Sequence, residues 1–196
     1  MVIECIPVGA FQANCYRLSL PERDDCILID PGAEPELLGA KKVAAVLLTH
    51  GHFDHIAAAK TFSKKGVPIF MHPDDEPMLT DSRLNGAGLF GFELNLNDIF
   101  PVPVHEGDAL SLAGMELTVL HTPGHSPGSV CFAFEGHLFT GDTLFKSGYG
   151  RYDLPGGDRR TLFRSLRRLA TLGENIAVHP GHGDETTMLK EKRAYE

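Results

Sequence analysis

Three imidazoles and one carboxylate lie within six residues of each other, at His50, His52, Asp54 and His55. They follow the apolar run 43–48, which we expect to form a buried strand. In extended backbone, residues two apart point to the same side, so His50 and His52 can face one point. Asp54 and His55 stand at the expected start of a helix and can turn toward a second point. Imidazole and carboxylate suit zinc, iron or manganese, so this loop predicts half-sites for two metal ions.

Side chains that bind metals recur where three other expected strands end. His125 follows the run 117–120 and a Pro-Gly turn, Asp142 follows a short run from residue 137, and His182 follows the run 176–178. A glycine precedes each of them and lets the backbone approach a site closely. Core packing explains such a recurrence poorly, so we expect these corners to meet at one centre.

The chain has ten histidines, and this centre would use five of them. For the others we expect packing, capping or surface roles. His121 and His179 lie beside the ligand loops, so they are the best candidates to hydrogen-bond to ligands. The remaining three are His72, His105 and His137.

Five segments together resemble the metallo-β-lactamase superfamily, and within it the short bacterial hydrolases similar to glyoxalase II. They are residues 49–55, 121–128, 140–145, 150–158 and 179–183. The resemblance covers nearly the whole chain. It implies an α/β fold of the four-layer αββα sandwich type, with metals at the edge between two sheets.

The resemblance also implies a ligand set for two divalent metal ions, zinc above all, with iron or manganese as alternatives. Asp142 would bridge the two ions, and Asp54 could also move a proton, so these two carboxylates are the candidate catalytic groups. Two such ions would lower the pKa of a shared water and present it as hydroxide to a carbonyl. The first ion would be held by His50, His52 and His125, and the second by Asp54, His55 and His182.

The implied activity is hydrolysis of a thioester such as S-lactoylglutathione. Arg151 stands near a basic glutathione contact of that family, and Lys190 and Arg193 could bind a carboxylate near the C-terminus. The sequence differs from the glyoxalase II pattern in three ways that weaken the case for glutathione as the thiol. The C-terminal helical domain of full-length glyoxalase II is expected to be absent, residues 56–57 replace small glycines, and Asp184 replaces an aromatic contact.

Three alternatives remain. A persulfide dioxygenase shares the fold and the motif at residues 148–153, but it uses a single iron on two histidines and an aspartate. A metallo-β-lactamase fits less well, because no cysteine lies near His182. A metal-binding module without catalysis would leave the full ligand set unexplained.

The composition fits one soluble domain over residues 1–196 with a small-molecule substrate. The net charge of −8 argues against a nucleic-acid surface, and no apolar run is long enough to cross a membrane. No basic stretch followed by an apolar one opens the chain, so we expect a cytoplasmic protein without a signal peptide. The four cysteines show no close spacing and are expected to be reduced and buried.

Short strands dominate the expected secondary structure, with helices between them. The segment 80–103 is a long irregular loop, either a flap over the metals or a segment that its aromatics anchor to the core. The helix 158–172 should be capped by Asp158, with arginines on a solvated face and an apolar stripe of Leu162, Phe163, Leu166 and Leu169. Other helices are expected at 35–40, 56–65, 74–79 and from 185, and strands at 2–8, 14–20, 26–29, 43–48, 109–112, 115–120, 130–134, 137–139 and 176–178.

Overall fold

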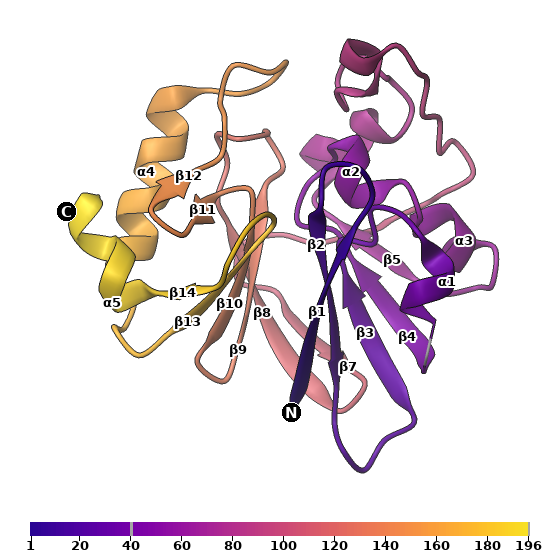
Figure 1. Ribbon diagram of the computed structural model, residues 1–196, viewed down its shortest axis with the longest axis horizontal. Coiled ribbons are helices and arrows are strands. Elements are labelled where there is room, and N and C mark those ends of the chain that lie inside the picture. The colour runs from indigo at the N-terminus through magenta and orange to yellow at the C-terminus, as the bar shows by residue number, and fades with distance from the viewer. Residues whose placement is uncertain (40, 196) are drawn as a thin grey trace.

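Two six-stranded sheets face each other in the computed structural model, which describes residues 1–39 and 41–195 (Figure 1). The first sheet begins with antiparallel strands and continues with parallel ones. In spatial order it consists of β1 (Val2–Val8), β2 (Ala13–Ser19), β3 (Asp25–Ile29), β4 (Lys42–Leu47), β5 (Ile69–Met71) and β6 (Val102–Pro103).

The second sheet is antiparallel except for one parallel pair, β10 with β13. A small hairpin of β11 (Leu144–Phe145) and β12 (Gly148–Tyr149) follows β10. In spatial order the sheet consists of β14 (Thr186–Thr187), β13 (Ala177–Pro180), β10 (His137–Gly141), β9 (Val130–Phe134), β8 (Met115–His121) and β7 (Ala109–Leu112).

Helices cover the outer face of each sheet, on the right and left of Figure 1, so the predicted αββα sandwich is confirmed. Over the first sheet lie α1 (Pro35–Leu38), α2 (Phe53–Ile56), α3 (Ala59–Ser63) and the 3-10 helices η1 (Pro73–Leu79) and η2 (Ala87–Phe90). Over the second lie α4 (Arg159–Ala170), α5 (Met188–Glu191) and the 3-10 helix η3 (Lys192–Ala194). Within the described residues, no helix combines the length and apolar character needed to cross a bilayer.

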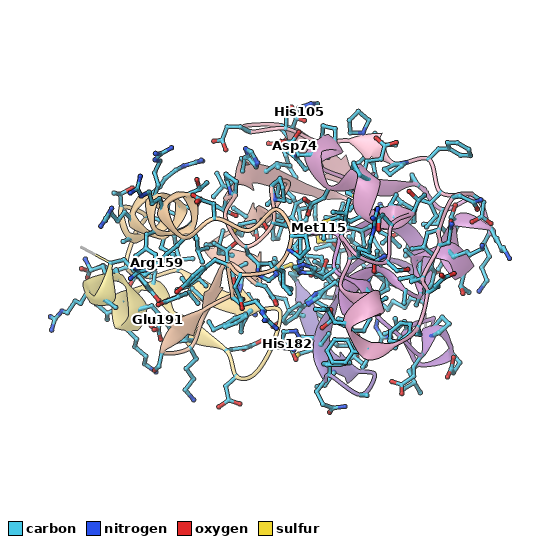
Figure 2. All side chains as sticks on the ribbon, turned by 90° about the horizontal axis from the view of Figure 1, so that it is seen from above. Asp74, His105, Met115, Arg159, His182 and Glu191 are labelled. Atoms are coloured by element: carbon cyan, nitrogen blue, oxygen red, sulfur yellow. The ribbon has the colours of Figure 1, made fainter. Side chains whose placement is uncertain are left out.

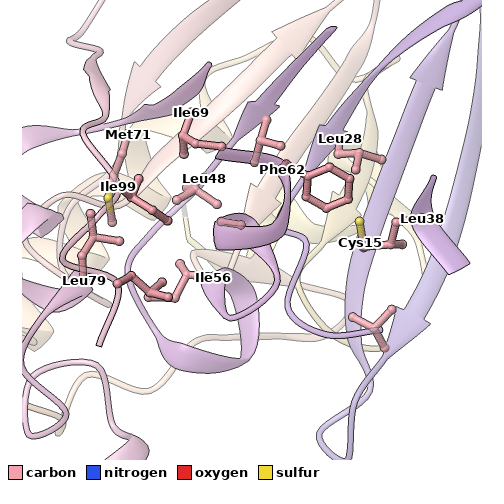
Figure 3. Packing of buried hydrophobic residues seen from close by; sticks show 14 residues of the cluster. Cys15, Leu28, Leu38, Leu48, Ile56, Phe62, Ile69, Met71, Leu79 and Ile99 are labelled. Atoms are coloured by element: carbon pink, nitrogen blue, oxygen red, sulfur yellow. The ribbon is translucent and has the colours of Figure 1, made fainter. Parts of the chain in front are cut away.

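Successive side chains of β3 point to opposite faces of the first sheet and pack in two different hydrophobic clusters. Ile27 and Ile29 point inward and pack in the cluster between the sheets, which also contains Phe132 and Phe139 of the second sheet. Leu28 points outward into the cluster beneath the helices of the first sheet (Figure 3). A strand buried on both faces reads as a continuous apolar run, as this one does.

The structure confirms the N-cap and most of the apolar stripe that were predicted for α4. Asp158 accepts a hydrogen bond from the backbone N–H of Thr161 at 2.7 Å, as an N-cap should. Leu162 anchors the buried stripe, but Phe163 is wrongly assigned to it and lies partly exposed, since it stands about 100° further round the helix. Ser165 is buried instead and donates a hydrogen bond to the carbonyl of Pro123.

Other expectations fail at short elements. The helix expected over 56–65 begins at Phe53 and is split into α2 and α3, and the segment expected as a helix at 74–79 is the 3-10 helix η1, which contains Pro77. The C-terminal helix begins at Met188, after the unpredicted strand β14. Strands β5, β6, β11 and β12 were also not predicted, and the expected end of the first helix at residue 40 lies outside the described residues. Cys5, expected to be buried, is exposed.

Candidate metal centre

The predicted ligands come together at one end of the two sheets. The loop after β4 carries His50 and His52, and the loops after β8, β10 and β13 carry His125, Asp142 and His182. Seen from above in Figure 2, His182 lies between the two halves of the molecule. The convergence follows from the fold, because these strands direct their carboxyl ends to the same edge of the sandwich.

The first group contains His50, His52 and His125, whose ligand nitrogens lie within 4.8 Å of one another. His52 Nδ1 lies 2.8 Å from His125 Nε2. The Nε2 atoms of His50 and His52 are buried and have no hydrogen-bond partner. Burial, together with the neighbouring imidazoles, lowers the pKa of both rings, which favours the neutral form that binds a metal.

The second group contains Asp54, His55 and His182. Asp54 Oδ2 lies 3.3 Å from His182 Nε2, and His182 Nε2 lies 3.3 Å from His55 Nε2. Two ring nitrogens this close need a shared proton or a cation between them. The donor set of two imidazoles and a carboxylate fits a divalent metal.

Asp142 stands between the two groups. Its Oδ1 lies 3.4 Å from His55 Nε2, and its Oδ2 lies 3.6 Å from His125 Nε2 and 3.7 Å from His182 Nε2. Oδ1 is buried without a hydrogen-bond partner. The loop leaves room for this carboxylate only because residue 181 is glycine, where an added Cβ would stand 2.2 Å from Oδ1. Oδ2 thus faces ligands of both groups and Oδ1 faces the second group, so this carboxylate can bridge two metals.

Without metal, the carboxylates control the charge of His55. Burial favours its neutral ring, but the charges of Asp142 and Asp54 and the hydrogen bond that His55 donates to Asp30 outweigh burial and raise its pKa to about 10. For Asp54, burial alone would raise the pKa of the carboxyl group. The neighbouring His55 and His182 outweigh burial and lower it. The pocket therefore stabilises opposite charges side by side, and a metal cation can replace the protons.

Backbone and side-chain partners fix the orientation of the rings. Asp30, which has a left-handed backbone with φ of 54°, accepts hydrogen bonds from Thr49 Oγ1 at 2.6 Å and from His55 Nδ1 at 3.0 Å. His125 Nδ1 donates to the carbonyl of Arg151 at 2.7 Å. The bonds of His55 and His125 occupy Nδ1 of each ring and leave Nε2 to face the centre.

A second supporting carboxylate, Asp75, was not predicted from the sequence. It lies on η1, is fully buried, and accepts hydrogen bonds from Gly51 N, Ser126 Oγ and Gly128 N. The sequence gives little indication of this role, because Asp74 and Asp75 are adjacent and nothing in the local pattern tells which one is buried. The supporting role expected of His121 and His179 falls instead to Asp30 and Asp75.

The described contacts of the His121 and His179 rings are with residues outside the two ligand groups. His121 Nε2 donates to the carbonyl of Pro127 at 3.0 Å, and its ring stacks on His72. His179 lies between His137 and Glu185, with ring-nitrogen contacts of 2.9 Å to each.

A pocket of about 280 Å³ opens above the ligands. Arg151 lines it, as expected of a substrate contact, and forms a bidentate ion pair with Asp153. Lys190 and Arg193 are exposed and do not belong to the residues that line it. Figure 2 shows Glu191 of the same segment well away from His182. The lining residues are Phe11, His52, Phe53, Asp54, Asn85, Gly86, Leu89, Phe90, His125, Asp142, Arg151, Leu154 and His182.

Similar proteins share this architecture over almost their full length. The hydroxyacylglutathione hydrolase GloC of Haemophilus influenzae is 39% identical, over 99% of this chain and 96% of its own. Among solved structures, TTHA1623 in a di-iron-bound form is 40% identical with a TM-score of 0.86, covering 97% of both chains. The BLEG-1 B3 metallo-beta-lactamase is 34% identical with a TM-score of 0.92, covering 98% of this chain and 97% of its own.

The family model described as the metallo-beta-lactamase superfamily matches residues 8–182, a span that begins in β1 and ends on His182. The match includes all seven predicted metal ligands. With the two facing sheets and the convergent histidines and aspartates, this shows that the chain belongs to the metallo-beta-lactamase superfamily.

Proposed function

We propose that this protein is a dinuclear metal-dependent hydrolase that cleaves thioesters of the S-lactoylglutathione type. The observation that carries the proposal is the position of Asp142 at the base of an open pocket, where its carboxylate lies near ligands of both groups. The similarity to GloC supports the substrate class. The family and the ligand clusters support divalent metals, and the di-iron form of TTHA1623 makes iron as reasonable as zinc or manganese.

When bound, the two metals would acidify a water and polarise the substrate carbonyl. His50, His52 and His125 would hold one metal, and Asp54, His55 and His182 the other, with Asp142 shared. Their rings need no reorientation, because Asp30 and the Arg151 carbonyl already hold His55 and His125 with Nε2 inward.

The reaction consumes one water for each thioester. An oxygen–carbon bond forms at the carbonyl, the carbon–sulfur bond breaks, and the products are a carboxylic acid and a thiol. Asp54 lines the pocket and lies 3.3 Å from His182 Nε2, so we place it where a proton could pass to the departing sulfur.

A single-iron persulfide dioxygenase needs only two histidines and one aspartate. This chain also has a second group of ligands, and the hydrogen bond between His55 and Asp30 orients one of its rings. A second metal site favours a two-metal hydrolase over the dioxygenase.

The test uses purified protein stripped of metal and reloaded with zinc, iron(II) or manganese. Loss of thioester absorbance from S-lactoylglutathione is followed together with metal content. We expect turnover that requires metal, is lost in His52→Ala and is retained in His105→Ala, which changes an exposed histidine outside the site. Oxygen uptake on glutathione persulfide without thioester hydrolysis would replace this proposal with the dioxygenase.

A further inference from the structure

Four aromatic rings pack against one another beside the metal ligands. Phe53 stands between His52 and Asp54 in the sequence, Phe11 comes from the connection between β1 and β2, and Phe90 ends η2. The ring centroids of Phe11 and Phe90 lie 4.7 Å apart, those of Phe11 and Phe53 5.2 Å, and those of Phe53 and Phe90 5.5 Å. Phe92 adds a fourth ring, 5.1 Å from Phe53. Three separate segments therefore build one apolar wall.

This wall is exposed although the chain has a well-filled core. Phe11 is 41% exposed, Phe90 54% and Leu89 64%, and all three line the pocket above the ligands. Exposed apolar groups that converge on a polar site indicate a place where a ligand is buried. The loop 80–103 was expected to be either a flap or an anchored segment. Its aromatics do not anchor it to the core, since Phe90 and Phe100 are exposed; Leu96 and Ile99 pack in the core, and Leu89 and Phe90 line the pocket.

The side chains that line the pocket offer few cationic partners for the carboxylates of a thiol. Arg151 is the one permanent cation among the described residues that line it. Its guanidinium is already paired with Asp153, at 2.8 and 2.9 Å. Glutathione carries two carboxylates, and this pocket offers a partner for at most one.

The size of the pocket points the same way. About 280 Å³ lies at the lower end of cavities that enclose small ligands. This volume has room for an acyl group with a phenyl ring or a branched chain, and the rest of a thioester can extend through the open side of the pocket. The charged end of a thiol would lie toward Arg151 and open solvent.

We infer that the preferred substrates are thioesters with an apolar, aromatic or branched acyl group, which binds against Phe11, Phe53, Leu89 and Phe90. This inference rests on the proposed thioesterase function and specifies its substrate class. Burying a phenyl ring against such a wall should favour it over a lactoyl group by at least tenfold in kcat/KM.

Four substrates separate the acyl group from the thiol. They combine a phenylacetyl or a lactoyl group with glutathione or with N-acetylcysteamine, a neutral thiol, and each is assayed with the metal-loaded protein. We expect both phenylacetyl thioesters to exceed the matching lactoyl ones by tenfold or more. Equal or better hydrolysis of the lactoyl thioesters would overturn the inference while the thioesterase function stood. Hydrolysis of none of them, with metals bound, would overturn the proposed function itself.

Two variants in the same loop make the test specific. Phe90→Ala removes one ring of the wall and should reduce the ratio of phenylacetyl to lactoyl hydrolysis at least fivefold. Phe100→Ala is the matched control, because Phe100 is 84% exposed and does not line this pocket. An unchanged preference in Phe90→Ala, or an equal loss in Phe100→Ala, would show that the wall does not select the acyl group.

Discussion

Asp75 Oδ2 accepts a hydrogen bond from Ser126 Oγ at 2.6 Å, and this contact holds the loop that carries His125 against η1. The same oxygen accepts from Gly51 N at 2.9 Å, between His50 and His52. The other oxygen accepts from Gly128 N at 2.6 Å, shortly after His125. One buried side chain thus holds the three ligands of the first group in register from outside the centre.

Asp75→Asn should therefore weaken metal binding without removing a ligand. The amide nitrogen would face a donor, so we expect the free energy of unfolding to fall by about 2–3 kcal/mol and metal affinity to fall by roughly 10- to 100-fold. Calorimetry and competition with a chromogenic chelator measure the two effects. Asp74→Asn is the matched control, since Asp74 is exposed at the edge of the molecule (Figure 2). Equal effects in both variants would disprove the role of Asp75.

Removing the bridge and removing a terminal ligand should have different consequences. Asp142→Ala takes an oxygen from both groups and should leave less than one tightly bound metal per chain. His182→Ala should mainly weaken the second group and leave about one metal per chain. Metal analysis after gel filtration gives both ratios, and identical loss of a single ion in both variants would contradict the bridging position.

Gly181 tests how closely the backbone must approach the centre. In Gly181→Ala the new Cβ would stand 2.2 Å from Asp142 Oδ1 and 2.8 Å from His55 Cε1, so one of these ligands must move. We expect at least a tenfold loss of metal affinity and of turnover. Gly173→Ala is the control, because a Cβ there meets nothing within 4 Å. Normal metal binding in Gly181→Ala would mean that the loop is more adaptable than the structure indicates.

The cysteines should divide into one reactive and three protected thiols. Cys5 is exposed, whereas Cys15, Cys26 and Cys131 are buried, and burial raises the pKa of Cys131 to about 12. A thiol reagent at neutral pH should label one site in the native protein and four after unfolding. Mass spectrometry of the labelled peptides identifies the site. Rapid native labelling of Cys131 would contradict the packing beneath α4.

The sequence predicted the fold and the convergence of the ligands well, for a physical reason. Apolar runs such as residues 26–29 mark strands, and a ligand just past a strand end must lie at the edge of its sheet. The family resemblance then assigned the bridge to Asp142. What it did not predict depends on tertiary contacts. Asp75 is distinguished from Asp74 only by what it packs against, and β14 is a strand only because it pairs with β13.

The same reasoning explains the mixed outcome for substrate contacts. Arg151 lines the pocket because its own carbonyl is held by His125, a ligand. Lys190 and Arg193 were proposed from charge and position along the chain, and neither property specifies where α5 and η3 pack. The aromatic wall combines residues about 80 positions apart, Phe11 and Phe90, so no local pattern reveals it.

If two metals in this centre act together to hydrolyse a thioester, the activity must depend on how many metals are bound to each chain. Metal-free protein is loaded stepwise with zinc or iron(II), and thioester hydrolysis is measured at each ratio of metal to chain. We expect activity to rise until about two metals are bound per chain and to be absent in His52→Ala. Full activity at one metal per chain, or no thioester hydrolysis at two, would contradict the proposed two-metal hydrolysis.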